Sequence, residues 1–329
     1  MKLIIQIPCL NEAATLPQTL ADLPKQIEGI DTIEWLIIDD GSTDDTVQVA
    51  REHGVHHIVQ HTGNKGLAKA FQSGINGCLQ YGADIIVNTD GDNQYPGRYI
   101  SDLVQPILQN KADMVIGERP IQDIPHFSRT KKLLQNVGSG VVRYVSGTSI
   151  PDAPSGFRAL SREAALRLTI LTNYTYTLET IIQASHKNLT VTSIPIQTNP
   201  KTRESRLIKS MSRYVLRSGA TIIWLFLLYR PLRTFSYLAL PFVLLGLTLW
   251  GRYGVLLVMG EGGRGANVQS ITVGAALLII GFMIFLIGLL GNLIAINRRL
   301  HEETLYHLKK LTVNSYRSEA HEHKETANG

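Results

Sequence analysis

Residues 83–94 read ADIIVNTDGDNQ, an apolar run that ends in a cluster of acidic and amide side chains. The apolar half is typical of a buried β-strand. Gly91 separates Asp90 from Asp92, so the chain can turn there and aim both carboxylates at one point. Together with the amide oxygen of Gln94, these oxygens suit Mg²⁺ or Mn²⁺. The bare pattern also fits a solvent-exposed turn, because Asp and Gly are common in turns.

Short apolar runs alternate with helical patterns through the first half of the chain. Besides 83–88, the runs that predict strands are 3–8, 34–39, 57–60 and 114–117. Apolar residues at helical spacing from Leu67 to Cys78 predict a helix that ends at Gly82. A second helix is expected after Ser42, with Asp45 in a capping box, and its end at Gly54. This alternation predicts an α/β fold with a parallel sheet.

Polar residues follow the other strands as well. Pro8, Asn11 and Glu12 end the first strand, and Asp39 and Asp40 end the second. Ligands of such sheets bind beyond the carboxyl ends of the strands. Glu12, Asp39 and Asp40 can therefore reach the base and ribose of a nucleotide through hydrogen bonds. The alternative is that Asp39 and Asp44 cap the next helix.

Two later stretches, 234–251 and 265–297, carry no charged residue. Each can cross a bilayer, which needs about 20 apolar residues. Basic residues flank both stretches, as the positive-inside rule expects of cytoplasmic ends: Arg213, Arg217, Arg230 and Arg233 before the first, and Arg298, Arg299, Lys309 and Lys310 after the second. We expect a two-span membrane protein whose catalytic domain and both termini are cytoplasmic. Two buried helices of a soluble core are the alternative.

The chain of 329 residues then divides into four parts. These are a catalytic domain (1–206), amphipathic juxtamembrane helices (207–233), a transmembrane hairpin (234–297, with spans at about 234–257 and 270–297) and a partly disordered tail (298–329). The net charge of +5 lies largely beside the apolar segments, so we do not expect nucleic acid as a partner. Two cysteines cannot form a disulfide framework, which indicates a reducing compartment.

Taken together, these motifs resemble glycosyltransferase family 2, and in particular polyprenyl-phosphate glycosyltransferases of the dolichyl-phosphate mannose synthase type. The resemblance runs from the first strand to about Arg206. The motifs that carry it are Pro8, Asn11-Glu12, Asp39 to Asp44, Asn64-Lys65-Gly66, Asp90 to Gln94, Gly117-Glu118-Arg119, Asp152 and Ser155 to Arg158. It implies a GT-A (Rossmann-like) fold, an inverting transfer from a UDP- or GDP-linked sugar, and a polyprenyl phosphate acceptor in the membrane.

The resemblance also assigns candidate roles. A divalent cation, Mg²⁺ or Mn²⁺, would be held by Asp90, Asp92 and Gln94. The nucleotide sugar would contact Pro8, Asn11, Glu12, Asp39, Asp40, Lys65, Asp90 and Gly91. Asp92, Asp152 and Arg119 are the candidate catalytic residues, with Asp152 binding sugar hydroxyls or orienting the acceptor arginines. Relatives with a membrane hairpin also imply self-association into a homo-oligomer.

The acceptor distinguishes members of this family. A phosphate monoester is already an anion near neutral pH, so no general base is needed, but its approach to an anionic donor needs positive charge. Arginine supplies that charge by bidentate contact. Arg119, Arg129 and Arg203 match the family's lipid-phosphate ligands, and Arg206 lies close by; each can equally be a surface or ion-paired residue. The segment 202–207 departs from the Gly-Ser-Lys form of the motif.

Several features have other readings. Glu179 is a candidate sugar contact or an exposed helix position. His53, His56, His57 and His61 are close in sequence, but adjacent histidines in a strand point to opposite faces, so we do not expect a metal site there.

Two other functions remain alternatives: a processive polysaccharide synthase and a non-catalytic nucleotide-binding scaffold. The Gln-Xaa-Xaa-Arg-Trp motif of processive synthases does not occur. The identity of the sugar and of the nucleotide does not follow from the sequence.

Overall fold

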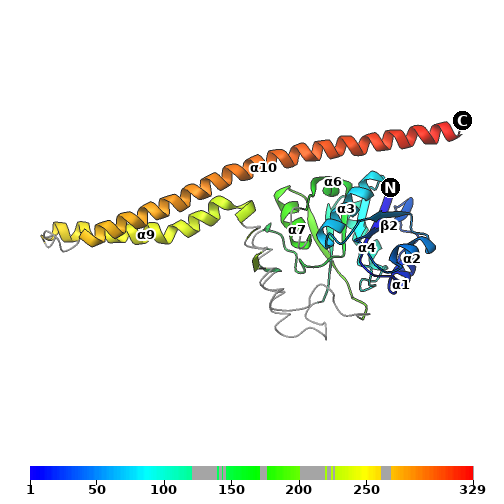
Figure 1. The fold of residues 1–329 in the computed structure, drawn as a ribbon, viewed down its shortest axis with the longest axis horizontal. Helices are drawn as coiled ribbons and strands as arrows, with labels where there is room; N and C mark the ends of the chain where they lie inside the picture. Colours follow the sequence, from blue (N-terminus) through cyan, green and yellow to red (C-terminus); the bar gives the residue numbers. More distant parts are fainter. Residues whose placement is uncertain are drawn as a thin grey trace. The chain divides into compact units, whose positions relative to one another are not determined.

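A computed structural model describes residues 1–120, 139, 140, 143, 146–170, 176–200, 219, 220, 224, 227–260 and 268–328. The chain forms two compact units. One unit comprises Met1–Gly219 and Leu305–Gly329, and the other comprises Ala220–Thr304. Figure 1 traces the elements along the chain.

The first unit contains one seven-stranded sheet in the order β3-β2-β1-β4-β6-β5-β7. The strands are β1 Lys2–Cys9, β2 Thr32–Asp39, β3 His57–Gln60, β4 Ile85–Asn88, β5 Met114–Glu118, β6 Arg158–Ser161 and β7 Val191–Pro195. All five predicted strands are confirmed. The five predicted strands run parallel to one another, and β6 is inserted antiparallel between β4 and β5. No apolar run in the sequence predicts β6 or β7.

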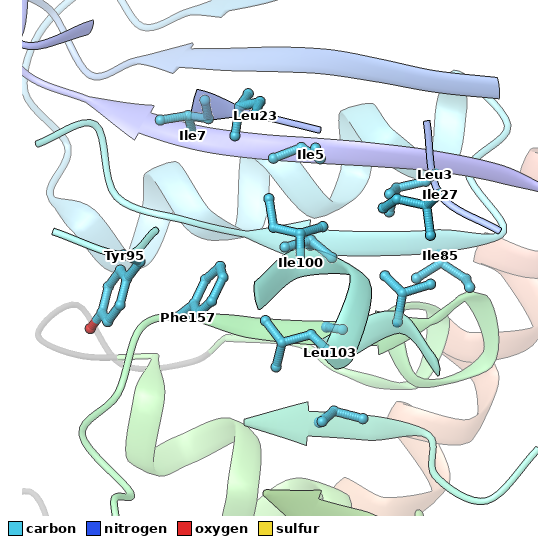
Figure 2. Packing of buried hydrophobic residues seen from close by; sticks show 14 of the residues in the cluster. Leu3, Ile5, Ile7, Leu23, Ile27, Ile85, Tyr95, Ile100, Leu103 and Phe157 are labelled. Atoms are coloured by element: carbon cyan, nitrogen blue, oxygen red, sulfur yellow. The ribbon is translucent and has the colours of Figure 1, made fainter. Parts of the chain in front are cut away.

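Alternation along β1 assigns its side chains to two faces of the sheet. Leu3, Ile5 and Ile7 belong to a buried cluster with residues of α1 (Leu16–Asp22) and α4 (Tyr99–Leu108). Figure 2 shows the part of the cluster that includes Ile100 and Leu103 of α4. On the other face α3 (Leu67–Gln80) packs closely, since a Cβ added at Gly74 would lie 2.4 Å from Gln6 Oε1. The predicted apolar stripe of this helix is therefore confirmed. The sheet is covered on both sides, which fixes the positions of the loops at its ends.

The helix after β2 begins later than predicted. α2 spans Thr46–Glu52, and Asp45 at its N-cap makes no side-chain capping bond, so the predicted capping box is wrong. Ser42 is instead used by a neighbouring loop, because its hydroxyl accepts a hydrogen bond from the Asn11 N–H at 2.9 Å. Asp44 Oδ1 accepts from the Thr46 N–H at 3.1 Å. The acidic loop after β2 is therefore longer than the sequence pattern indicated.

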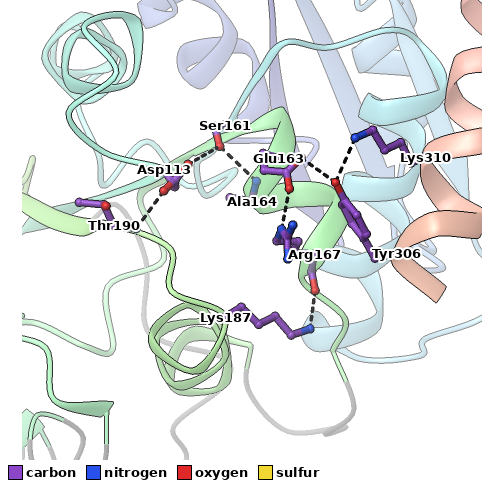
Figure 3. A network of polar contacts seen from close by, with 9 residues as sticks. All are labelled: Asp113, Ser161, Glu163, Ala164, Arg167, Lys187, Thr190, Tyr306 and Lys310. Atoms are coloured by element: carbon purple, nitrogen blue, oxygen red, sulfur yellow. Dashed lines mark hydrogen bonds and ion pairs between the residues drawn. The ribbon is translucent and has the colours of Figure 1, made fainter. Parts of the chain in front are cut away.

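Two further helices, α6 (Arg162–Arg167) and α7 (Thr177–His186), follow β6. Tyr306, from the C-terminal segment of the same unit, packs on α6. Tyr306 is buried, its hydroxyl donates to Glu163 at 3.1 Å, and the Arg167 guanidinium lies 4.4 Å from its ring centre. Figure 3 shows this network. The tail residue Lys309 also donates to the Leu168 carbonyl at 3.2 Å.

The second unit is a helical hairpin of α9 (Pro231–Val258) and the first part of α10 (Val268–Asn328). Both are long and apolar enough to cross a membrane. Gly274, Gly281 and Gly288 recur every seven residues on α10, and a Cβ at each would lie 2.6–2.7 Å from Trp250, Val243 or Phe235 of α9. Small residues of this kind let apolar helices approach closely.

The helix α10 continues beyond the apolar segment to Asn328, although the polar sequence of residues 298–329 predicts a partly disordered tail. Its last part, from Leu305, belongs to the first unit. No proline occurs between 298 and 329, and Glu, Leu and Lys are good helix formers. The low hydropathy of this segment therefore does not indicate loss of structure.

Candidate active site

The loops after β1 and β2 are tied together by side chains. Asn11 has the left-handed φ of 56°, and its Oδ1 accepts from the Thr43 N–H at 2.7 Å. The Glu12 N–H donates to Thr46 Oγ1 at 2.8 Å, and the Ala13 N–H donates to Asp44 at 3.2 Å. These bonds bring the predicted residues Asn11 and Glu12 close to the end of β2.

The two aspartates at the end of β2 have different surroundings. Asp39 Oδ1 accepts from the Ser42 N–H at 3.0 Å, which closes a turn rather than capping α2. The alternative that Asp39 and Asp44 both cap the next helix is therefore wrong for Asp39, whereas Asp44 accepts from the N–H of Thr46, the first residue of α2. Asp40 accepts from the Lys65 and Gly66 N–H groups, both at 2.8 Å. Pro8 lies in β1 directly opposite Ile38, one residue before these aspartates.

The Asp90–Gln94 turn is held from three sides. The Gly91 carbonyl accepts from the Thr15 and Thr19 hydroxyls at 2.9 and 3.1 Å. Asp92 Oδ1 accepts from the Gln94 N–H at 3.1 Å. Asn199, more than a hundred residues later, donates from its side chain to the Asn93 carbonyl at 2.9 Å. The backbone of the predicted metal-binding turn is therefore fixed.

Acidic groups gather around one buried thiol at this edge. Cys9 is buried, and burial together with the charges of Glu12, Asp39, Asp90 and Asp44 raises its pKa well above the usual value. These four carboxylates come from three different loops. The predicted concentration of acidic side chains at the carboxyl edge of the sheet is thus present in the folded chain.

Neither cysteine is expected to react with a thiol reagent in the native protein at pH 8. Burial raises the pKa of Cys78 as well, and both thiols are free. A raised pKa contributes stability below the unfolded value of about 8.5, and this stability is lost as the pH rises above it. Labelling with a maleimide should modify no cysteine in the native chain and two after denaturation. Fast native labelling would contradict this burial.

The arginine after β5 is paired inside the domain. Arg119 Nε and Nη2 donate to the two carboxylate oxygens of Asp152 at 2.7 and 3.0 Å. Asp152 is fully buried, and Arg119 is 12% exposed. Burial by itself would lower the pKa of Arg119, but Tyr95, Asp152 and Asp90 raise it, so the guanidinium stays charged. Nη1 makes no hydrogen bond to any residue that the structure describes.

Two tyrosines that no sequence motif predicted lie in the same region. Tyr95 stacks on Phe157 with ring centres 5.0 Å apart, and burial raises its pKa to about 12. Tyr176 donates to the Gly156 carbonyl at 3.4 Å. A Cβ at Gly156 would lie 2.9 Å from the Tyr176 hydroxyl and 3.4 Å from Asp90 Oδ1, so only glycine fits there. Tyr95 directly follows the acidic turn, which is the one sequence signal that could have indicated it.

Several predicted residues have other outcomes. Lys65 is exposed at the turn that Asp40 holds. Glu179 is fully buried and accepts from Gln183 Nε2 at 3.1 Å, so its reading as an exposed helix position is wrong. Arg129, Arg203 and Arg206 lie outside the described residues. In the part of the chain that the structure describes, no three His, Cys, Asp or Glu side chains are placed to share a metal ion.

Comparison with known proteins identifies the family. The model of a family described as glycosyl transferase family 2 matches residues 4–169, which is just over half of the chain. The chain belongs to glycosyl transferase family 2. Its relatives include a UDP-N-acetylglucosamine–dolichyl-phosphate N-acetylglucosaminyltransferase from Methanococcus voltae, 28% identical over 218 residues that cover 58% of this chain and 83% of that protein. A polyprenol monophosphomannose synthase from Mycolicibacterium smegmatis is 24% identical over 204 residues, covering 59% and 76%.

Among solved structures, this family 2 glycosyltransferase is similar to glucosyl-3-phosphoglycerate synthase from Mycobacterium tuberculosis in complex with Mn²⁺, UDP-glucose and phosphoglyceric acid. The TM-score is 0.54 at 21% identity, with 67% of this chain and 79% of that chain covered. The similarity shows a GT-A-like fold for the sheet domain. The predicted fold is confirmed, and two helices long enough to cross a membrane follow it.

Proposed function

We propose that this family 2 glycosyltransferase moves a hexose-type sugar from a UDP- or GDP-linked donor to a membrane polyprenyl phosphate, with inversion at the sugar carbon. The observation that carries the proposal is the charged, buried Arg119–Asp152 pair beside the acidic edge of the sheet. Relatives named for transfer to dolichyl phosphate and for polyprenol monophosphomannose synthesis support the acceptor class.

The loops after β1 and β2 suit the nucleoside half of the donor. Glu12 and Asp39 present carboxylate oxygens, which accept hydrogen bonds from ribose hydroxyls and from base N–H groups. Both side chains are buried, and hydrogen bonds hold the loops that carry them. Rigid placement of this kind lowers the entropy lost on binding. Pro8 and Asn11 are proposed to contact the nucleotide at the same edge of the sheet.

The Asp90–Gln94 turn suits a divalent cation bound together with the donor. Two carboxylates and one amide oxygen are hard ligands, and Mg²⁺ is commonly held by one or two carboxylates plus substrate phosphates. In such a site diphosphate oxygens and water complete the ligand shell. A cation there supplies charge neutralisation for the departing nucleoside diphosphate. Asp90 and Asp92 would be its protein ligands, with Gln94 behind them.

Arg119 suits the acceptor. Its bidentate bond to Asp152 uses Nε and one Nη2 hydrogen, which leaves Nη1 to donate to an incoming phosphate oxygen. Asp152 is fully buried, which favours orientation of Arg119 over contact with a sugar hydroxyl. Because the phosphate monoester is already ionised, the enzyme needs to admit a second anion rather than to remove a proton. Arg129, Arg203 and Arg206 are proposed as further phosphate ligands.

The helical hairpin suits a membrane anchor. Leu244, Leu245 and Leu247 are each more than half exposed, and 11% of the apolar window in α9 is buried. An apolar surface of this kind is stable in lipid rather than in water. We propose two spans with the catalytic domain and both termini in the cytoplasm, where basic residues flank the spans.

The test is a transfer assay with the full chain in detergent or vesicles. A panel of UDP- and GDP-sugars is offered with one polyprenyl phosphate and Mg²⁺ or Mn²⁺. We expect one donor to give a chloroform-soluble product with inverted anomeric configuration, and chelator to abolish it. Long polymer would instead indicate a processive synthase. Nucleotide binding without turnover on any donor would indicate a scaffold.

A further inference from the structure

A chain of hydrogen bonds lies behind the nucleotide side of the site. His61 Nδ1 is 2.7 Å from Asp40 Oδ1, and its Nε2 is 2.9 Å from the hydroxyl of Ser73 on α3. The side chains of His61 and Asp40 are 5% and 6% exposed. Since a carboxylate only accepts hydrogen bonds, the Nδ1–H of His61 is the donor in its hydrogen bond to Asp40. Both ring nitrogens of His61 are therefore engaged.

Asp40, held by His61, also binds the backbone of the 63–66 turn. Its Oδ1 also accepts from the Lys65 N–H, and its Oδ2 accepts from the Gly66 N–H, both at 2.8 Å. Gly66 has a φ of 90° and is the N-cap residue of α3. The carboxylate thus closes the turn that presents the exposed Lys65 side chain.

The turn rests directly on the acidic loop after β2. A Cβ added at Gly41 would lie 2.6 Å from the Gly63 carbonyl carbon and 2.8 Å from the Asn64 nitrogen. Backbone therefore packs on backbone, and Gly41 also has a φ of +80°. A shift of the 63–66 turn would displace the loop that begins at Asp39.

The order Asp40, His61, Ser73 resembles the hydrogen-bond chain of a serine hydrolase, but its surroundings do not suit that chemistry. Ser73 lies inside α3, and His61 is almost fully buried. Both oxygens of Asp40 already accept backbone N–H groups. A nucleophile needs an open path to its substrate and donors for the oxyanion. These hydrogen bonds instead link α3 to Asp40 and to the 63–66 turn.

We propose that His61 is a positioning residue for the nucleotide of the donor, acting through Asp40 on the Lys65–Gly66 turn. The inference rests on the proposed function, in which the loops after β1 to β3 bind a nucleotide sugar. Without His61, the Asp40 carboxylate loses one of its three hydrogen-bond donors. The carboxylate is then less firmly placed, and so is the Lys65–Gly66 turn that it binds. Affinity for the donor should fall more than the rate of transfer.

The test compares four single variants of the full chain. Asparagine places an amide nitrogen near the position of Nδ1, whereas glutamine places one near Nε2, so His61→Asn can keep the bond to Asp40 and His61→Gln cannot. We expect His61→Ala and His61→Gln to raise the KM for the nucleotide sugar about tenfold. His61→Asn should restore the KM to within about threefold, with kcat changed little in all three. Ser73→Ala should have a small effect.

His57→Ala is the matched control, since His57 on β3 also contacts a carboxylate, that of Glu34, at 2.7 Å. It should lower thermal stability without changing KM. Calorimetric binding of UDP and GDP with Mn²⁺ gives an independent readout. If the wild-type chain turns over and His61→Ala keeps its KM, the inference fails while the function stands. If nucleotide binds and depends on His61 but no lipid product forms, the function fails while the inference stands. Equal effects of His57→Ala and His61→Ala on KM would also overturn it.

Discussion

Replacing Asp92 with asparagine is expected to lower sugar transfer by about 10³-fold or more, because the change removes a negative charge from the proposed cation site. The fold should stay intact. An asparagine Oδ1 can still accept the Gln94 N–H bond that Asp92 accepts at 3.1 Å, and the threonines that hold Gly91 are untouched. Transfer is measured with the best donor of the panel, and Mn²⁺ affinity by calorimetry with nucleotide present.

Asp45→Asn is the matched control for this experiment. Asp45 is exposed, lies at the N-cap of α2 and makes no side-chain capping bond. Its replacement should leave transfer within about twofold, since a surface carboxylate without a fixed partner contributes little. If Asp92→Asn retained more than a tenth of wild-type transfer while chelator still inhibited, the cation would have to be held elsewhere.

Breaking the Arg119–Asp152 pair is expected to lower both the stability of the domain and the kcat/KM for the acceptor. Asp152→Asn leaves a guanidinium without its buried counter-charge, and such a loss typically costs about 3 kcal/mol. Arg119→Lys keeps the charge but cannot make the bidentate bond at 2.7 and 3.0 Å. Both variants should lower kcat/KM for polyprenyl phosphate about 100-fold, with a smaller change in the KM for the donor.

The control is a second arginine–carboxylate pair in the same domain. Arg167 Nε lies 2.5 Å from Glu163, and their side chains are 28% and 41% exposed. Arg167→Lys should change stability by less than about 1 kcal/mol and leave transfer unchanged. A larger effect of Arg119→Lys on donor KM than on acceptor kcat/KM would place Arg119 on the donor side and contradict its proposed role.

Strands and the α3 helix could be predicted because their signals are local. Period-two and continuous apolar runs identify β1 to β5, and helical spacing identifies α3, whose buried residues include Phe71 and Ile75. β6 was missed because its four residues, Arg158–Ser161, include an arginine that is buried only through the bonds it makes to α7 and to Ser155. The four-residue sequence of β6 carries no signal that Arg158 will find partners on α7 and at Ser155.

The site was predictable in part for the same reason. The acidic residues follow strand ends in the sequence, and parallel strands bring their carboxyl ends to one edge. That His61 and Asp40 share a bond, that Asn199 holds the acidic turn, and that glycines every seven residues on α10 pack on α9 depend on distant partners.

By itself, then, the sequence determined the family, the strand ends that carry the acidic groups and the two apolar helices, because each depends on residues close together along the chain. Only the tertiary structure decided that Asp40 closes a turn, that Asp152 pairs with Arg119 and that Tyr306 packs on α6. Each of these side chains has many possible partners of similar chemistry in the sequence, and only the packing of the whole domain places one of them within bonding distance.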